Sequence, residues 1–219
     1  MKAAKDAITI RRYKLPVPLS DMDDVLRVCY EFEVKSRGHD AIMDARVQST
    51  IAKVARWLVD QDTKPSLLLY GGVGNGKTTV ARTIDRAIAG LCATARGNVV
   101  IENNVERGGP LSRISRPLFL SAQTIIDDAG TGDWSKALNN MELVIIDDLG
   151  CEPVSAKVYG TELTPIVEIL RSRYDKMKST VITTNLDLDG IGDRYGARIL
   201  DRIKETFELI AFDNKSYRR

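Results

Sequence analysis

The sequence predicts an α/β protein in which a mainly parallel sheet is covered by helices on both faces. The first observation is a set of short, continuous apolar runs of strand length, at residues 67–70, 117–120, 143–146 and 180–183. The second is that stretches with helical periodicity connect these runs, as crossovers between parallel strands require. The third is a glycine-rich turn placed between the first run and a helix.

The composition is that of an ordinary globular protein. The chain has 219 residues, of which 43% are hydrophobic and 28% are charged, so it is long enough to bury a sizeable core. Its 32 basic and 30 acidic residues leave a net charge of +2, which is too small to indicate a nucleic-acid-binding protein by itself. No apolar stretch has the length of a signal peptide or a membrane span, so we expect a cytoplasmic protein.

The cysteines do not suggest a structural framework. Cys29, Cys92 and Cys151 are far apart and form no Cys-x-x-Cys pair, which argues against disulfides and zinc knuckles. The region before the first strand holds only Cys29 and the single histidine, His39, too few ligands for a tetrahedral zinc site. We therefore expect no structural zinc, and we interpret His39 as a turn residue.

Two helices are expected before the first strand. Apolar residues recur three or four positions apart over residues 20–37 and again over residues 41–59. The polar, proline-containing segment 62–65 then interrupts the pattern. We therefore divide the chain into a small helical N-terminal region, residues 1–62, and a second domain, residues 63–219.

The remaining elements alternate between strand and helix. The strand at 67–70 leads through the glycine-rich turn to a helix at 77–91, and a helix at 163–177 precedes the strand at 180–183. A helix at 196–205 and a strand at 207–212 follow. The segment 93–116, with its glycines and scattered arginines, has no clear period, and both a loop and a hairpin remain open.

The glycine-rich turn carries the most specific motif. Residues 71–78 satisfy the Walker A pattern G-x-x-x-x-G-K-[ST] between a strand and a helix. Such a loop points backbone N–H groups at phosphate oxygens, next to the positive end of the following helix. Lys77 is expected at the β- and γ-phosphates of ATP and Thr78 on Mg²⁺. The expected cradle comprises Gly71, Gly72, Val73, Gly74, Asn75, Gly76, Lys77, Thr78 and Thr79.

Two further strands end in polar side chains. The run at 143–146 delivers Asp147 and Asp148 to a strand end, where ligands of parallel sheets collect, as in a Walker B motif. Asp147 is expected to hold Mg²⁺, and Asp148 to activate the water that attacks the γ-phosphate. Asn185, after the strand at 180–183, is a candidate sensor of that phosphate. Taken singly, each of these residues is also typical of a turn.

Together these segments resemble the AAA+ ATPases, and within them the helicase loaders of the DnaC and DnaI type and the related IstB-like transposition helpers. The resemblance covers about residues 65–219, and the matching segments are 71–79, 147–150, 183–186, 195–203 and 215–218. It implies the P-loop NTPase fold of the AAA+ (ASCE) class, with a right-handed, five-stranded parallel sheet. It also implies that the core lacks a C-terminal helical lid.

The resemblance adds roles that the spacing alone does not provide. Arg202 looks like an arginine finger that reaches the ATP site of a neighbouring subunit, and Arg198, one helical turn earlier, is the second candidate. The chain would then associate with itself to complete the site. In helicase loaders the N-terminal region binds the replicative helicase, so residues 1–62 are the candidate partner-binding region. Their helices are equally suited to covering the ATPase core.

The leading hypothesis is an ATP-hydrolysing helicase loader that acts on single-stranded DNA. Candidate DNA contacts lie between the two Walker motifs, at Arg107, Arg113, Arg116 and Trp134. An IstB-like ATPase that assists a transposase is the nearest alternative. A small-molecule P-loop kinase and a nucleotide-gated adaptor without significant hydrolysis are the others. Paired aspartates, Asn185 and Arg202 fit a water-attacking, oligomeric ATPase better than a kinase.

Overall fold

The computed structural model describes residues 12–97, 100–102, 105–107, 114–128, 134–158 and 161–213. Its centre is one sheet of five strands in the order β4-β5-β8-β1-β9, and each pair of neighbouring strands is parallel. The strands are β1 (Ser66–Gly71), β4 (Leu118–Ser121), β5 (Leu143–Leu149), β8 (Ser179–Thr184) and β9 (Phe207–Phe212). The predicted five-stranded parallel sheet is therefore confirmed.

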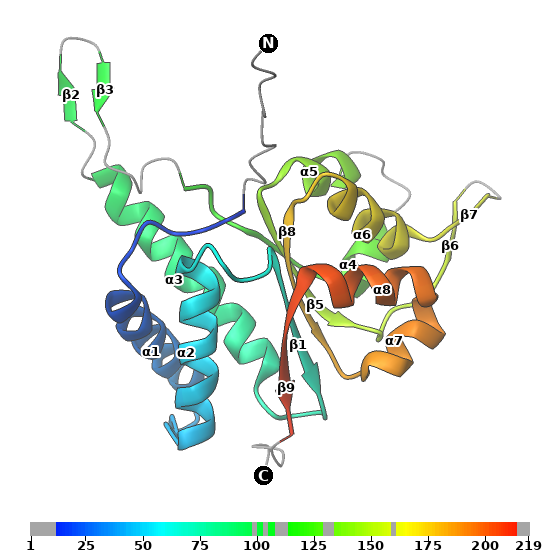
Figure 1. The fold of residues 1–219 in the computed structure, drawn as a ribbon, viewed down its shortest axis with the longest axis horizontal. Helices are drawn as coiled ribbons and strands as arrows, with labels where there is room; N and C mark the ends of the chain where they lie inside the picture. Colours follow the sequence, from blue (N-terminus) through cyan, green and yellow to red (C-terminus); the bar gives the residue numbers. More distant parts are fainter. Residues whose placement is uncertain are drawn as a thin grey trace, which may run out of the picture.

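Helices cover both faces of this sheet, as Figure 1 shows. On one face lie α1 (Leu19–Lys35), α2 (Ala45–Val59) and α3 (Lys77–Gly97). On the other face lie α4 (Ala122–Asp127), α5 (Trp134–Asn140), α6 (Pro165–Asp175), α7 (Leu188–Tyr195) and α8 (Ala197–Thr206). Two antiparallel hairpins complete the described elements: β2 (Val100–Glu102) with β3 (Val105–Arg107), and β6 (Ala156–Val158) with β7 (Thr161–Leu163).

Successive residues of β1 supply two different cores. Leu67 and Leu69 pack in the core beneath α1–α3, whereas Leu68 packs in the core beneath α4–α8, and all three side chains are fully buried. Residues 143–146 of β5 alternate between the two cores in the same way. Because side chains alternate along a strand and both faces are covered, these strands have continuous apolar sequences.

The N-terminal helices pack against the sheet layer. Asp44 caps α2, its carboxylate accepting hydrogen bonds from the backbone N–H groups of Arg46 and Val47 at 3.0 and 2.8 Å. Trp57, near the end of α2, is 1% exposed, and its indole N–H donates to Lys64 O at 3.0 Å. Both α1 and α2 contribute to the core that also holds β1 and α3. The division of the chain at residue 62 stays a prediction.

Differences from the expected elements have local causes. The predicted helix at 77–91 continues to Gly97, and the irregular segment that follows contains the β2–β3 hairpin. The predicted helix at 163–177 is shorter, because Leu163 pairs with Ala156 in the β6–β7 hairpin and α6 ends at Asp175. Helices α4, α5 and α7 were not predicted, since elements of six to eight residues are too short for a clear period.

The amino edge of the sheet is organised by one buried guanidinium. Arg173 of α6 is 1% exposed, and it donates to Thr180 Oγ1 at 2.8 Å and to Met141 O at 3.1 Å. It also donates to the carbonyl oxygens of Leu138 and Ser179. Burial lowers the pKa of this guanidinium from 12.5 to about 10, so it remains a cation at neutral pH. Arg173 therefore joins α5, α6 and β8.

Replacing Arg173 by methionine is expected to destabilise the protein by about 3 kcal/mol or more, because buried oxygen atoms would lose their hydrogen-bond donor. Arg171→Met on the exposed side of the same helix is the matched control, and we expect its effect to stay within about 0.5 kcal/mol. The free energy of unfolding in urea measures both variants. Equal stability of the two would contradict the structural role of Arg173.

Candidate nucleotide-binding site

Residues 72–76 connect β1 to α3 at the carboxyl edge of the sheet. Gly71 has φ of +135°, and a Cβ atom there would lie 2.2 Å from Phe212 O, so this position requires glycine. Gly76 has φ of 97° and directly precedes α3, whose first turn carries no acidic residue. The positive N-terminal end of this 21-residue helix therefore points into the loop, and no carboxylate in the first turn offsets it. This arrangement favours an anion in the loop.

Lys77 lies folded into this loop and is 5% exposed. Its Nζ donates to Gly71 O at 2.8 Å, to Gly72 O at 2.5 Å and to Asn75 Oδ1 at 3.0 Å. The Asn75 amide in turn donates to Phe212 O at 2.7 Å, and this side chain is 2% exposed. These three acceptors are neutral oxygen atoms, which phosphate oxygens can replace with stronger, charge-assisted hydrogen bonds.

Two threonine hydroxyls converge on Asp147 at the end of β5. Thr78 Oγ1 donates to Asp147 Oδ1 at 3.0 Å, and Thr183 Oγ1 donates to the same atom at 2.6 Å. The Thr183 hydroxyl also accepts the backbone N–H of Asp148 at 2.9 Å. Thr78 and Asp147, both expected at the metal, are thus brought together. Thr183, fully buried in β8, was not predicted, because a threonine within a strand carries no distinctive signal.

Asp148 and Asn185 lie exposed at this same edge of the sheet. Asp148 has φ of 57°, in the left-handed region that aspartate tolerates better than most residues. Asp147 is buried, whereas the carboxylate of Asp148, the next residue, is exposed. Asn185 follows β8, the strand that pairs with β5. The edge therefore presents one buried carboxylate, one exposed carboxylate and one exposed amide.

A buried glutamate supports the turn after Asp148. Glu152 is 1% exposed, and its carboxylate accepts the backbone N–H of Gly150 at 2.8 Å and the phenol of Tyr195. Its own carbonyl accepts a hydrogen bond from Arg194. Burial, and then the hydrogen bond to Glu152, raise the pKa of the Tyr195 phenol, so it stays a donor at neutral pH. These contacts join α7 to the turn that follows Asp148, and no local sequence pattern predicts them.

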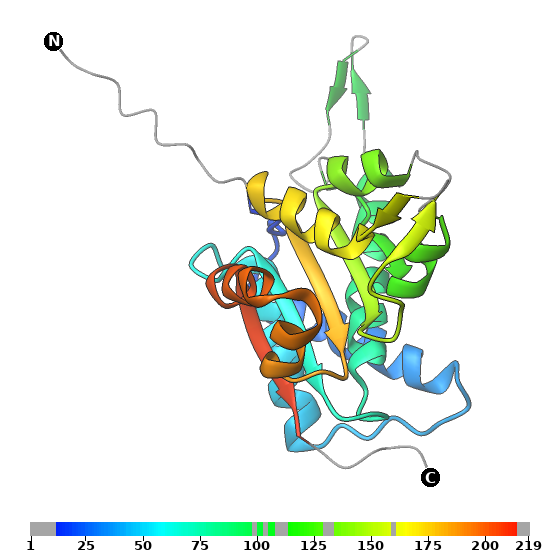
Figure 2. The same cartoon turned by 90° about the vertical axis from the view of Figure 1, so that its right-hand side faces the viewer.

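The N-terminal region also contacts the loop helix. Arg37, just after α1, donates from Nη1 to Thr79 Oγ1 at 2.9 Å. Thr79 is the last residue of the expected cradle, and it is 9% exposed. Figure 2 shows the link between α1 and α2 passing close to the start of α3. Arg37 was not among the predicted site residues, because nothing in its local sequence indicates a contact so far along the chain.

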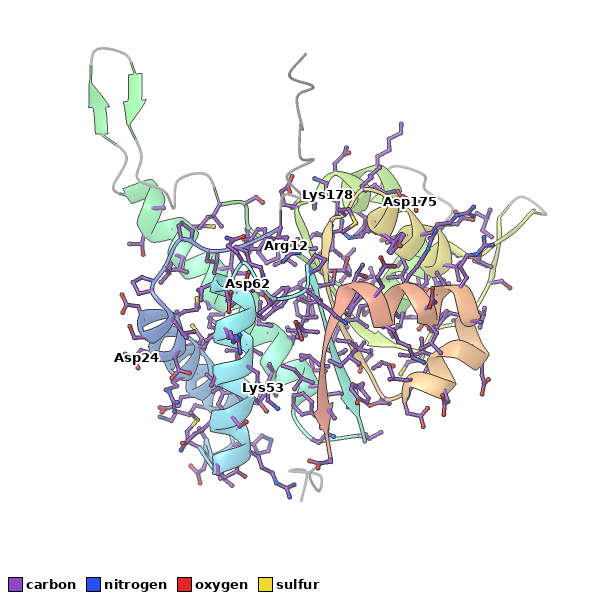
Figure 3. The ribbon with its side chains drawn as sticks, in the orientation of Figure 1. Arg12, Asp24, Lys53, Asp62, Asp175 and Lys178 are labelled. Atoms are coloured by element: carbon purple, nitrogen blue, oxygen red, sulfur yellow. The ribbon has the colours of Figure 1, made fainter. Side chains whose placement is uncertain are left out.

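The two candidate finger arginines lie on α8. Arg202 of α8 contacts α6, with its Nη2 atom 3.3 Å from Asp175 Oδ1 and its guanidinium 4.3 Å from the centre of the Tyr174 ring. Figure 3 shows Asp175 and Lys178 at one end of the molecule, whereas the carboxyl end of β1 lies at the other end. Arg198 is exposed one turn earlier on α8. The structure therefore places Arg202 against α6 and leaves Arg198 exposed on α8.

The candidate DNA contacts are not gathered into a described surface. Arg116 is 63% exposed and forms an ion pair with Asp85 at 3.3 Å. Arg113 lies outside the described residues. The side chains of Arg107 and Trp134 are likewise outside the described part of the structure. The four residues remain a prediction.

The donor set at Asp147 fits a magnesium ion. A threonine hydroxyl and a carboxylate are hard oxygen ligands, and Mg²⁺ usually takes one or two of these from the protein together with phosphate oxygens and waters. Over the described ranges, no group of three or more His, Cys, Asp or Glu residues forms an all-protein metal cage. Within the same ranges, no helix has the length and apolar character needed to cross a bilayer.

Comparison with known proteins identifies the family. A sequence model of the family described as IstB-like ATP binding protein matches residues 11–219. A search of curated protein sequences gives no match.

Solved structures share the fold. The DnaC helicase loader matches with a TM-score of 0.55 and 19% identity, over 79% of this chain and 93% of that one. DnaI matches with a TM-score of 0.57 and 17% identity, over 93% and 95% of the two chains. AMPPCP-bound DnaA from Aquifex aeolicus matches with a TM-score of 0.52 and 18% identity, over 80% of this chain and 50% of that one. The chain thus has the AAA+ P-loop fold and belongs to the family of IstB-like ATP binding proteins.

Proposed function

We propose that this protein binds ATP with Mg²⁺ in the loop at residues 71–79 and hydrolyses it to ADP and phosphate. The observation that carries the proposal is the convergence of Thr78 and Thr183 on Asp147, beside the buried Lys77 and the exposed Asp148. A phosphate-binding loop, an oxygen donor pair and an exposed carboxylate then share one edge of the sheet. These are the components that hydrolysis of a nucleoside triphosphate requires.

Each residue of the site has a defined task in this proposal. Lys77 exchanges its contacts to Gly71, Gly72 and Asn75 for the β- and γ-phosphate oxygens. Thr78 and Asp147 hold Mg²⁺, which when bound polarises phosphate oxygens and offsets their negative charge. The Asp148 carboxylate accepts a proton from water as the water oxygen bonds to the γ-phosphorus and the bond to the β–γ bridging oxygen breaks. Asn185 orients that water.

The position of Arg202 supports a site shared between subunits. Its guanidinium contacts Asp175 and Tyr174 in α6, away from the protomer's own loop. A second copy of the chain must then bring Arg202, or Arg198 beside it, to the γ-phosphate. A planar guanidinium stabilises the charge that develops on the transferred phosphoryl group. Self-association would thus switch on hydrolysis.

The proposed biological role is the loading of a replicative helicase onto single-stranded DNA. The fold shared with a DnaC helicase loader supports this role, and residues 1–62 are the proposed helicase-binding region, attached to an ATPase domain at residues 63–219. The cytoplasm is the proposed location. The family description favours a second candidate, an IstB-like ATPase that prepares target DNA for a transposase.

A matched pair of variants tests the ATPase proposal. Lys77→Ala is expected to weaken ATP binding about 10- to 100-fold, because charge-assisted contacts to the phosphates are lost. Asp148→Asn is expected to leave binding nearly unchanged and to lower turnover about 10²- to 10⁴-fold, because the amide does not accept the proton. Calorimetric titration and phosphate release measure the two properties. An equal loss of binding in both variants would contradict the assigned roles, and transfer of phosphate to a nucleoside monophosphate would indicate a kinase.

The shared site predicts that Arg202→Ala binds ATP as the wild type does but hydrolyses it about 10³-fold more slowly in the assembled state. Turnover should be measured as a function of protein concentration, with sedimentation showing assembly. Arg171→Ala, an exposed arginine on α6, is the control. If Arg202→Ala assembles and turns over at the wild-type rate, Arg202 is not the finger, and Arg198→Ala becomes the variant to test.

Co-purification distinguishes the two candidate roles. The 219-residue chain with ATP and single-stranded DNA is expected to retain a replicative helicase, and Lys77→Ala, which binds nucleotide poorly, should retain about tenfold less. Recovery of a transposase in place of the helicase would support the IstB-like alternative. Nucleotide-dependent capture by Asp148→Asn equal to that of the wild type would mean that binding, and not hydrolysis, drives assembly.

A further inference from the structure

Arg37 is a charged side chain of the N-terminal region that reaches the edge of the candidate phosphate cradle. Its Nη1 atom lies 2.9 Å from Thr79 Oγ1, and Thr79 directly follows Thr78 at the start of α3. The Arg37 side chain is 38% exposed, so its guanidinium is not confined in the core and has room to change partner. Gly38, with φ of +75°, follows it and turns the chain toward α2.

The local charges favour an anion beside this guanidinium. The positive end of α3 and the Lys77 ammonium face the loop, and Arg37 adds a third positive group. The carboxylate nearest to Arg37 among the ion pairs of the described residues is Glu33, at 3.7 Å. Glu33 is 6% exposed and is held more closely by Arg86 of α3, at 2.5 Å. One buried carboxylate thus serves two arginines, Arg37 and Arg86.

The present partner of Arg37 is also weaker than a phosphate would be. Thr79 offers a neutral hydroxyl oxygen, whereas a phosphate oxygen is charged and forms shorter and roughly twice as strong hydrogen bonds with guanidinium groups. The exchange requires only a change of acceptor at the edge of the loop. Arg37 is therefore positioned at the loop, next to Thr79, where it can contact a bound polyphosphate.

We propose that Arg37 binds the phosphate chain of the nucleotide, and that α1 thereby responds to whether the site is filled. This inference rests on the proposed binding of ATP. In the bound state the ligand joins Arg37 to the loop, while Glu33 joins α1 to Arg86 on α3. The carboxyl end of α1 is then fastened to the ATPase core at two points, and the contact through the ligand is lost when nucleotide leaves.

The test compares Arg37→Gln with Lys35→Gln, a matched control at the same end of α1. Lys35 is 65% exposed and pairs only with Glu31, at 3.3 Å, among the ion pairs of the described residues. Calorimetric titration with Mg²⁺ and ATP is expected to show about tenfold weaker binding for Arg37→Gln and unchanged binding for Lys35→Gln. Arg37→Lys, which keeps the charge without the planar fork, should give an intermediate affinity and serves as the second variant should Arg37→Gln not fold.

Hydrogen exchange supplies the readout that a merely structural role would not change. Addition of ATP to the wild type is expected to slow amide exchange at residues 33–37, and this slowing should be absent in Arg37→Gln. Equal ATP affinity of Arg37→Gln and Lys35→Gln would overturn the proposed role of Arg37. ATP-dependent protection of α1 in Arg37→Gln would overturn it as well, and neither result would contradict ATP binding itself. A wild-type protein that fails to bind ATP would overturn the proposed function as well, so the two failures are distinguishable.

Discussion

The candidate site depends on a single carboxylate oxygen that joins three elements. Asp147 Oδ1, at the end of β5, accepts hydrogen bonds from Thr78 in α3 and from Thr183 in β8. These donors lie 69 and 36 residues from Asp147 in the chain. They meet because parallel strands deliver their carboxyl ends to one edge, where the connections to the following helices begin. A carboxylate held by two hydroxyls has little conformational freedom left, as a preorganised oxygen ligand requires.

The same edge is supported by β9, the last strand of the sheet. Phe212 O approaches Gly71 and accepts a hydrogen bond from Asn75, so the loop at residues 71–76 packs on the backbone of β9. The opposite edge holds the Arg173 network and Arg202. A strand of six residues, such as β1, spans about 20 Å. That separation is longer than an arginine side chain, so Arg202 lies out of reach of the loop in its own protomer.

The fold and the centre of the site could be predicted because their signals are local. Strands buried on both faces appear as continuous apolar runs, and the loop at residues 71–79 combines glycines with Lys77 in a pattern that few other structures require. Asp147 and Asp148 were found because they end such a run. The short helices α4, α5 and α7 escaped prediction because six to eight residues do not establish a period.

The sequence by itself thus determined the strands of the central sheet, the longer helices and the chemical groups of the loop at residues 71–79, since all of these follow from neighbouring residues. Only the tertiary structure decided that Thr183 would donate to Asp147, that Glu152 would hold the Walker B turn against α7, and that Arg37 would reach Thr79. A hydroxyl, a carboxylate or a guanidinium has many possible partners in an unfolded chain. Its partner is selected by the packing of elements that are distant in sequence, and no local sequence pattern predicts which of these elements will meet.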